Sequence, residues 1–268
     1  MDQRGVLYFL AANGNRGRLH SVHLRVSVHS MRQNSWQGPV HIACGDEAGE
    51  ETARAIQSDE RSGQVTWSRV AFDPSSERAY SGKTRMQEWS RFESTVYVDA
   101  DTVFAGDIEP LWATDARIVL TQFSSWTSNG KKVSGRIDSW REFVPEMVEK
   151  AHSVELPAIN TGVASFTKAC KFFPAWRSIC AKSPKMWIGD ESAAQVLIAC
   201  RSDWRCVDGR FNASPTYGPH EDARIVHFHG MKVLKKPEVR AKFEPYLESA
   251  KRDGFAGITE VLRGAGVE

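Results

Sequence analysis

The sequence lacks any hydrophobic run that could cross a membrane. The apolar stretch at residues 6–12 is far shorter than the roughly 20 residues that a transmembrane helix needs. An acidic residue stands beside a basic one ahead of that stretch, unlike the basic flank of a signal peptide. We therefore expect no transmembrane segment and a cytoplasmic location.

Cysteine is scarce, and its spacing carries no pattern. The chain has 5 cysteines, an odd number, and no two of them are spaced as Cys-x-x-Cys. A disulfide framework needs pairs, and a cysteine zinc site needs close spacing. We therefore expect neither, and the cysteines should behave as small buried hydrophobic residues.

An excess of one charge sign is also lacking. Lysine and arginine number 35 against 33 aspartates and glutamates, which leaves a formal net charge of +2. Nucleic-acid binders concentrate basic residues in a stripe or patch, so we expect no nucleic-acid partner. A phosphate-binding P-loop is missing too: residues 82–84 read Gly-Lys-Thr, but Glu77 stands where the first glycine is required.

A regular alternation of strand and helix patterns is present in the first half. Short apolar runs predict strands, and longer stretches with helical spacing separate them. The predicted strands are residues 6–11, 40–43, 65–70 and 95–98, and the predicted helices are residues 19–31, 47–58 and 81–92. Such repeated units build an α/β fold, with a mostly parallel sheet flanked by helices. Ligands bind these sheets at the carboxyl ends of the strands.

The second half is less regular. The predicted strands there are residues 118–123, 160–167 and 225–228, the predicted helices are 140–152, 193–200 and 244–262, and residues 124–135 read as a polar loop. No repeat or linker divides the chain, so we expect a single domain over 1–268. Its expected parts are a nucleotide-binding half at 1–110, an acceptor and metal half at 111–243 and a helical tail at 244–268.

The strongest chemical signal is the acidic pair Asp99 and Asp101, which follows an apolar strand. Residues i and i+2 of an extended chain point to the same side, so the two carboxylates can converge on one ligand. Because like charges repel, their convergence favours a hard divalent cation with oxygen ligands. Such a cation can offset the charge that develops on a diphosphate leaving group. The alternative is that both acids cap the next turn and face solvent.

A second signal follows the late strand at 225–228. His227 and His229 stand at i and i+2, and Gly230 and Lys232 come next. Glycine lets the backbone approach a ligand closely, and a lysine ammonium can reach phosphate. One imidazole with two carboxylates is a donor set compatible with manganese and less typical of magnesium. The alternative is a pair of ordinary histidines.

Taken together and in order, these segments resemble glycosyltransferase family 8, the glycogenin and galactosyltransferase group. Residues 99–101 and 227–232 carry the resemblance. Residues 160–162, Asn-Thr-Gly, resemble the family's Asn-x-Gly segment beneath the donor sugar. Residues 190–191, Asp-Glu, resemble its Asp-Gln segment beside the reacting carbon. Order and spacing agree from about residue 6 to residue 236.

The resemblance implies a GT-A fold, a Rossmann-like sheet with a smaller acceptor-side region. It implies a nucleotide-sugar donor, usually a UDP-sugar, transfer with retention of the anomeric configuration, and Mn²⁺ or Mg²⁺ as the cofactor. The acceptor stays open.

The resemblance also assigns roles to residues. The implied metal ligands are Asp99, Asp101 and His227. The residues implied at the sugar and its reacting carbon are Asn160, Asp190 and Glu191. The implied contacts to the donor are Ala11, Asn13, Lys83, Arg85, Asp99, Ala100, Asn160, Thr161, Gly162, Gly230 and Lys232.

Two departures from the family pattern matter. Glu191 stands where the family often has glutamine, which changes the charge beside the reacting carbon. The family's closing Lys-Pro-Trp is not reproduced here, where residues 232–238 read Lys-Val-Leu-Lys-Lys-Pro-Glu. The lysine that contacts the diphosphate could therefore be Lys232, Lys235 or Lys236.

Two other functions compete with a transferase. Residues 99–103 also resemble the first motif of haloacid-dehalogenase-type phosphatases. That motif normally opens its fold, whereas here about four strands precede it. The candidate for its metal motif, Gly189-Asp190, also lacks a second acid at the expected place. The other alternative is a catalytically silent protein that only binds a nucleotide sugar.

Overall fold

The computed structural model describes residues 4–12, 14–60, 64–72, 82–112, 117–127, 131–182, 189–216, 222–229, 236–253 and 258. Asn13, Gly230, Lys232 and Lys235 lie outside the described residues.

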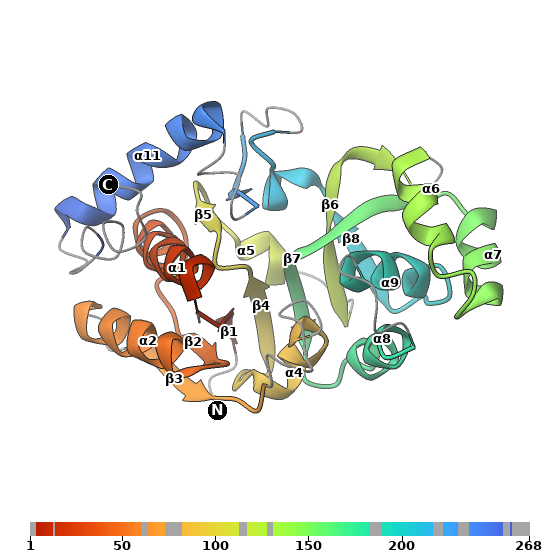
Figure 1. Cartoon of the computed structure of the whole chain (residues 1–268), viewed down its shortest axis with the longest axis horizontal. Helices are drawn as coiled ribbons and strands as arrows, with labels where there is room; N and C mark the ends of the chain where they lie inside the picture. The colour runs from red at the N-terminus through yellow and green to blue at the C-terminus, as the bar shows by residue number, and fades with distance from the viewer. Residues whose placement is uncertain are drawn as a thin grey trace.

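A central sheet runs through the molecule in the strand order β3-β2-β1-β4-β7-β6-β8 (Figure 1). The strands from the first half are β1 (Arg4–Leu10), β2 (Val40–Cys44), β3 (Val65–Arg69) and β4 (Ser94–Val98). All neighbouring pairs among these four are parallel. Helices α1 (Gly14–Asn34) and α2 (Glu47–Asp59) connect the first three strands. The alternation in the sequence predicted this half correctly.

The second half completes the sheet in a mixed direction. Strand β7 (Pro157–Thr167) lies antiparallel between β4 and β6 (Ile118–Thr127), and β8 (Trp204–Val207) pairs parallel with β6. A separate two-stranded sheet joins β5 (Thr102–Phe104) to β9 (Ile225–His227). This small sheet brings the two chemical signals of the sequence together, although about 120 residues separate them.

Helices of the second half lie beside the β6–β8 end of the sheet (Figure 1). They are α6 (Lys131–Asp138), α7 (Pro145–Ser153), α8 (Phe172–Cys180) and α9 (Gly189–Ile198). The remaining helical elements are η1 (Lys83–Arg85), α4 (Met86–Trp89), α5 (Glu109–Trp112), η2 (Gly209–Asn212) and α11 (Pro237–Arg252).

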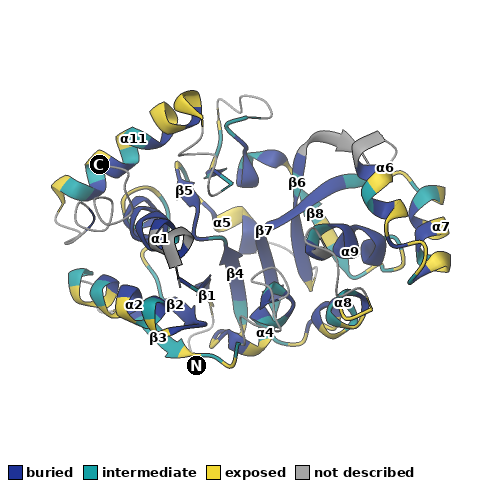
Figure 2. Cartoon of the chain, viewed as in Figure 1, coloured by how far each residue is buried: buried dark blue, intermediate teal, exposed yellow. Residues whose placement is uncertain are grey.

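The core explains why the sheet needs helices on both faces. Successive side chains of a strand point to opposite faces. In β1, Val6, Tyr8 and Leu10 pack in a cluster that includes buried residues of α1 and α2. Leu7 and Phe9 pack in a second cluster that includes buried residues of α4, α8 and α9. Figure 2 shows the sheet strands as largely buried, which fits a strand covered on both sides.

Several elements differ from the sequence prediction, and three of them have a clear local cause or boundary. The helix predicted over 81–92 is shorter among the described residues, because the chain is extended at Ser90 (ψ 140°), where its hydroxyl accepts from the Phe92 amide. The predicted polar loop at 124–135 is wrong over most of its length, since β6 continues to Thr127 and α6 begins at Lys131. The last long helix begins at Pro237 rather than 244, because proline fits the first helical turn.

The cysteines match the expectation of small buried residues only in part. All five are free thiols; Cys44 and Cys170 are buried, whereas Cys200 is exposed. Within the described part of the chain, no helix has the length and apolar character needed to cross a membrane.

Candidate active site

The acidic pair lies in the turn that joins β4 to β5. The backbone amide of Asp99 donates to the carbonyl of Gly162 on β7 over 2.7 Å, which fixes the end of β4. Residues 100 and 101 form a turn. The two carboxylates therefore converge because the chain bends, and not because it is extended as the i, i+2 spacing suggested. The position at the carboxyl end of β4 is the predicted one.

His227 reaches the same point through strand pairing. In the β5–β9 register it faces Thr102, the residue after Asp101. The Phe228 amide also donates to the Asp101 carbonyl at 2.9 Å. As a result, His227 Nε2 lies 3.1 Å from Asp101 Oδ1 and 3.7 Å from Asp99 Oδ2. One ligand atom from each of these three residues lies within 4.8 Å of the others.

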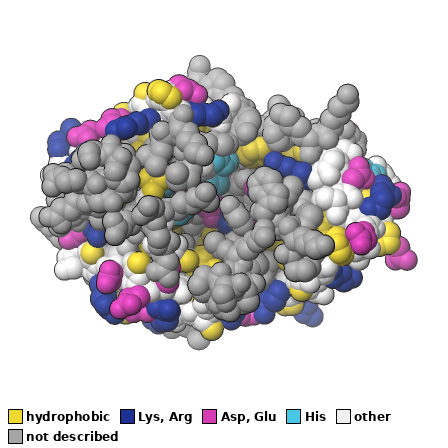
Figure 3. Space-filling model, viewed as in Figure 1, with side chains coloured by type: hydrophobic (Ala, Val, Ile, Leu, Met, Phe, Trp, Pro, Cys, Tyr) yellow, Lys and Arg dark blue, Asp and Glu magenta, His cyan; other side chains and the backbone are white. Residues whose placement is uncertain are grey.

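Charge at this site also fits a divalent cation. Among the described residues, the carboxylates of Asp99, Asp101, Asp190 and Glu191 share the neighbourhood with only Lys83 and Arg136 as permanent cations. A net negative charge therefore remains when His227 is neutral, even with Glu191 partly protonated. Oxygen and imidazole donors in one cluster suit Mn²⁺, and also Mg²⁺ with less preference. Figure 3 shows histidine side chains near the middle of this face of the molecule.

Asp99 is held at both carboxylate oxygens. The Tyr97 hydroxyl donates to Oδ1 at 2.8 Å, and Lys83 Nζ donates to Oδ2 at 2.7 Å. Lys83 Nζ also lies 3.7 Å from Asp190 Oδ2. Although burial lowers the pKa of Lys83, the attraction of Asp99 and Asp190 outweighs it and the pKa is raised. This lysine therefore stays charged and bridges the acidic pair to α9.

The imidazole and Asp101 stabilise each other's charged forms. Burial raises the pKa of Asp101, but the attraction of His227 is stronger and holds the pKa well below its ordinary value. Burial likewise lowers the pKa of His227, while Asp101 raises it by more, so the net shift is upward. In the absence of a cation, both shifts therefore favour an ion pair between the imidazolium and the carboxylate.

The residues predicted at the sugar lie next to this cluster. Asp190 and Glu191 occupy the first turn of α9, where the helix dipole favours negative charge. Thr161 donates to Asp190 Oδ2 at 2.9 Å, and Asn160 Nδ2 donates to Glu191 Oε1. The structure thus brings the 160–162 segment and the 190–191 segment to the same edge as the acidic pair.

Glu191 has a raised pKa. Burial, and next the charge of Asp190, raise the pKa of Glu191 to about 7 against the opposing effects of Lys83 and Arg136. Arg136 of α6 forms an ion pair with it at 3.2 Å. The glutamate that departs from the family pattern is therefore accompanied by its own counter-ion.

Other predicted residues are distributed around the cluster. Ala11 directly follows β1 and is half-buried, and Ala100 is buried in the turn between the two aspartates. Arg85 donates to the Ala71 carbonyl at 2.6 Å and pairs with Glu88, so of the predicted basic pair only Lys83 contacts the acidic cluster. Lys236 is exposed at the start of α11.

Sequence reasoning missed three residues of the site. Tyr97 holds Asp99, Arg136 pairs with Glu191, and Asn212 supports Asn160. Tyr97 lies two residues before Asp99 in the predicted strand at 95–98, so its position gave a signal. The others carry none, because each reaches the site through the tertiary fold.

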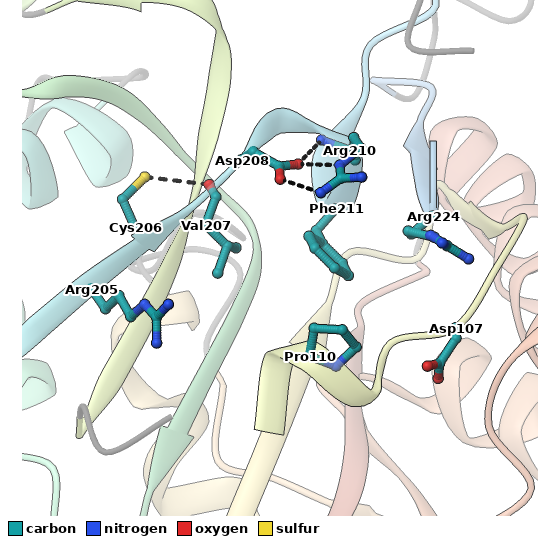
Figure 4. Close-up of a pocket in the computed structure, with 9 residues that line it drawn as sticks. All are labelled: Asp107, Pro110, Arg205, Cys206, Val207, Asp208, Arg210, Phe211 and Arg224. Atoms are coloured by element: carbon teal, nitrogen blue, oxygen red, sulfur yellow. Dashed lines mark hydrogen bonds and ion pairs between the residues drawn. The ribbon is translucent and has the colours of Figure 1, made fainter. Parts of the chain in front are cut away.

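A separate groove lies away from the predicted site. It encloses about 450 Å³ and is lined from β8, η2, α5 and the segments next to β5 and β9 (Figure 4). Arg210 in this groove pairs with Asp208 and Asp222. None of the predicted site residues lines it.

A sheet of this order, with an acidic turn at the end of its fourth strand, has the GT-A glycosyltransferase fold. The galactosyltransferase LgtC, solved with donor and acceptor sugar analogs, superposes with a TM-score of 0.68 at 15% identity over 97% of this chain and 99% of LgtC. Mouse xyloside xylosyltransferase 1 gives 0.59 at 14% identity over 85% of this chain and 98% of its own.

GlyE of Streptococcus pneumoniae, a glycosyltransferase, gives a TM-score of 0.63 at 12% identity over 100% of this chain and 64% of its own. No protein-family model matches the sequence, and no curated protein is found as a relative. The resemblance predicted from the sequence is therefore confirmed at the level of the fold.

Proposed function

We propose that this protein is a metal-dependent glycosyltransferase that moves a sugar from a nucleoside diphosphate sugar, with a UDP-sugar as the expected donor, to an acceptor. The observation that carries the proposal is the convergence of Asp99, Asp101 and His227 beside Asn160 and Asp190, at one edge of a GT-A sheet. We further propose that the transfer retains the anomeric configuration.

Asp99, Asp101 and His227 would hold Mn²⁺ or Mg²⁺, and a cation bound there supplies charge stabilisation for the departing diphosphate. The chain's own residues do the rest of the positioning. Lys83 adds a fixed positive charge beside Asp99. Such preorganised charge stabilises a charge that develops in the transition state without reorganisation.

Asp190 and Asn160 supply the polar groups for the sugar. Asp190 is 6% exposed, and its carboxylate is oriented by Thr161 and Lys83. Buried, oriented carboxylates favour the positive character that a sugar gains at its reacting carbon. The similar structures include a galactosyltransferase and a xylosyltransferase, so the fold leaves the donor sugar undecided.

The phosphatase alternative has no support from the fold. Its mechanism needs partner groups arranged around an attacking aspartate. Asp99 instead lies with Asp101 and His227 at the edge of a sheet whose similar structures are glycosyltransferases.

The test is thermal stability of the protein against a panel of nucleotide sugars, with and without Mn²⁺. A ligand that binds only the native state raises the melting temperature by mass action. We expect stabilisation by one UDP-sugar that requires Mn²⁺. Stabilisation by Mg²⁺ with phosphate analogues, and by no nucleotide sugar, would favour the phosphatase instead.

Hydrolysis of that donor without an acceptor separates the enzyme from a silent binder. We expect slow, Mn²⁺-dependent release of UDP. A protein that binds the donor and releases no UDP, with or without candidate acceptors, would be a binding protein.

A further inference from the structure

One buried asparagine connects the two halves of the candidate site. Asn212, the last residue of η2, is 1% exposed, and its amide group contacts three partners. Its Nδ2 lies 2.7 Å from Asn160 Oδ1 and 2.8 Å from Thr121 Oγ1, and its Oδ1 lies 3.0 Å from His227 Nδ1. The amide therefore uses both of its N–H groups and its oxygen.

The orientation of Asn160 follows from a backbone group. The Gly162 amide can only donate, and it lies 2.7 Å from one terminal atom of the Asn160 side chain. That atom must be the oxygen. The Asn160 nitrogen then faces Glu191, whose carboxylate accepts.

The orientation of Asn212 follows in turn. The Asn160 oxygen needs a donor, so the Asn212 nitrogen faces it and the Asn212 oxygen faces His227. An amide oxygen only accepts. His227 Nδ1 must therefore carry a proton.

We propose that Asn212 is a positioning residue that keeps a proton on His227 Nδ1, so that Nε2, which faces Asp99 and Asp101, is the nitrogen that loses its proton when a cation binds. In the metal-free protein Nε2 lies 3.1 Å from Asp101 Oδ1, which only accepts, so the charged imidazole is protonated on both nitrogens. A histidine ligates a cation through an unprotonated nitrogen, and the hydrogen bond of the other nitrogen decides which one that is. The metal part of the inference rests on the proposed function, whereas the Nδ1 proton follows from the hydrogen bonds alone.

The network also explains a glycine. A Cβ at position 162 would lie 2.5 Å from His227 Cε1 and 2.8 Å from Asn160 Oδ1. The backbone that fixes Asn160 therefore packs directly against the imidazole that Asn212 orients. Asn160, expected at the donor sugar, and His227, expected at the metal, are therefore joined through hydrogen bonds to Asn212.

The experiment compares Asn212→Ala with Thr121→Val. The first removes the acceptor for His227 Nδ1, and the second removes one other partner of the same amide. We expect Asn212→Ala to weaken Mn²⁺ binding about 10- to 100-fold in calorimetry, as for other groups that orient a ligand. Thr121→Val should lower thermal stability and leave Mn²⁺ affinity within about threefold of the wild type.

A spectroscopic measurement separates positioning from a general loss of structure. Long-range ¹H–¹⁵N correlation spectra of the metal-free protein, at a pH where the imidazole is neutral, report which nitrogen of His227 is protonated. The His227→Gln variant assigns the signals. We expect an Nδ1 proton in the wild type and in Thr121→Val, and a shift toward Nε2 in Asn212→Ala.

Asn212→Asp serves if the alanine variant does not fold, because a carboxylate still accepts from Nδ1 and should keep the proton there. An Nε2 proton in the wild type, or an unchanged proton position and Mn²⁺ affinity in Asn212→Ala, would overturn the inference. Absence of Mn²⁺ binding to the wild type would instead overturn the proposed metal-dependent function, and the proton position would still decide the role of Asn212.

Discussion

At the scale of single residues, uncompensated negative charge organises the site. Three different partners meet the carboxylates: Lys83 contacts Asp99 and Asp190, His227 contacts Asp101, and Arg136 contacts Glu191. Removing one member of a buried charged set leaves its partner uncompensated, which costs several kcal/mol. The residues should therefore respond to substitution in distinct ways.

We expect Asp101→Asn to lower Mn²⁺-dependent donor turnover by about a hundredfold or more, because each 1.4 kcal/mol of lost transition-state stabilisation is about tenfold in rate. The substitution keeps the side-chain shape and removes its charge. Steady-state UDP release over a range of Mn²⁺ concentrations measures the effect. The matched control is Asp107→Asn, an exposed aspartate whose Oδ1 accepts from the Glu109 amide. Turnover of Asp101→Asn equal to that of the control would contradict the metal assignment.

Glu191 should make stability depend on pH. Its pKa is raised to about 7 in the native protein, from an ordinary value of 4.5. Between these values the native state binds more protons than the unfolded state, so the free energy of unfolding falls as pH rises. This contribution is fully present below about pH 4.5 and is lost as pH rises through about 7.

Urea unfolding from pH 4.5 to 8 in EDTA, with wild type and Glu191→Gln compared at each pH, isolates this contribution. We expect the wild type to lose stability relative to the glutamine variant as pH rises. Parallel pH profiles for the two proteins would show that Glu191 is ionised throughout.

The sequence could predict the residues that define the metal site but not those that hold them. Asp99, Asp101 and His227 stand in short motifs next to apolar strands, so their type and spacing were visible. Asn212 and Arg136 lie 52 and 55 residues from the partners they orient, Asn160 and Glu191. Contacts of that kind depend on the path of the chain, which no local pattern specifies.

At the scale of elements, the close approach of Gly162 on β7 to His227 on β9 positions the imidazole. Gly162 of β7 leaves room for the ring of His227, and an added methyl group would meet its Cε1 at 2.5 Å. Overpacking a well-filled interior forces side chains to move and costs about 1–3 kcal/mol. Here the moving groups are a metal ligand and Asn160.

We therefore expect Gly162→Ala to weaken Mn²⁺ binding by about 10-fold or more and to lower stability by about 1–3 kcal/mol. Calorimetric Mn²⁺ titration and urea unfolding measure the two effects. Gly135→Ala is the control: nothing lies within 4 Å of its added Cβ, and alanine favours a helix such as α6. The control should bind Mn²⁺ normally and be slightly more stable. Normal Mn²⁺ binding by both variants would show that His227 does not ligate from this position.

The elements of the first half were predictable because buried parallel strands read as compact apolar runs between helical stretches. The second half was harder for a physical reason. Periodicity identifies a buried strand such as β7 but carries no information on its direction. Polar side chains from Ser124 to Ser128 suggested a loop, although part of this stretch extends β6 to Thr127.

At the scale of the whole molecule, three hydrophobic clusters build the fold from the sheet outward. Two of them cover the opposite faces of the sheet, and the third joins the outer side of α1 to α11. Phe243 of α11 is 3% exposed, and its ring lies 5.1 Å from Phe228 and 5.2 Å from His23. Phe228 follows His227 and bonds to Asp101 through its amide. The C-terminal helix therefore packs against Phe228, the residue whose amide fixes Asp101 beside His227.

This arrangement predicts that α11 is part of the cooperative fold and not a detachable tail. We expect Phe243→Ala to lower the free energy of unfolding by about 3–5 kcal/mol, because it removes a buried aromatic ring and leaves a cavity. Urea unfolding followed by tryptophan fluorescence measures it. Arg240→Ala on the same helix, with a 45% exposed side chain paired to Glu244, should change stability by less than about 1 kcal/mol. If the two variants unfolded alike, α11 would be only loosely attached, and the support it gives to Phe228 and the metal ligands could not be inferred.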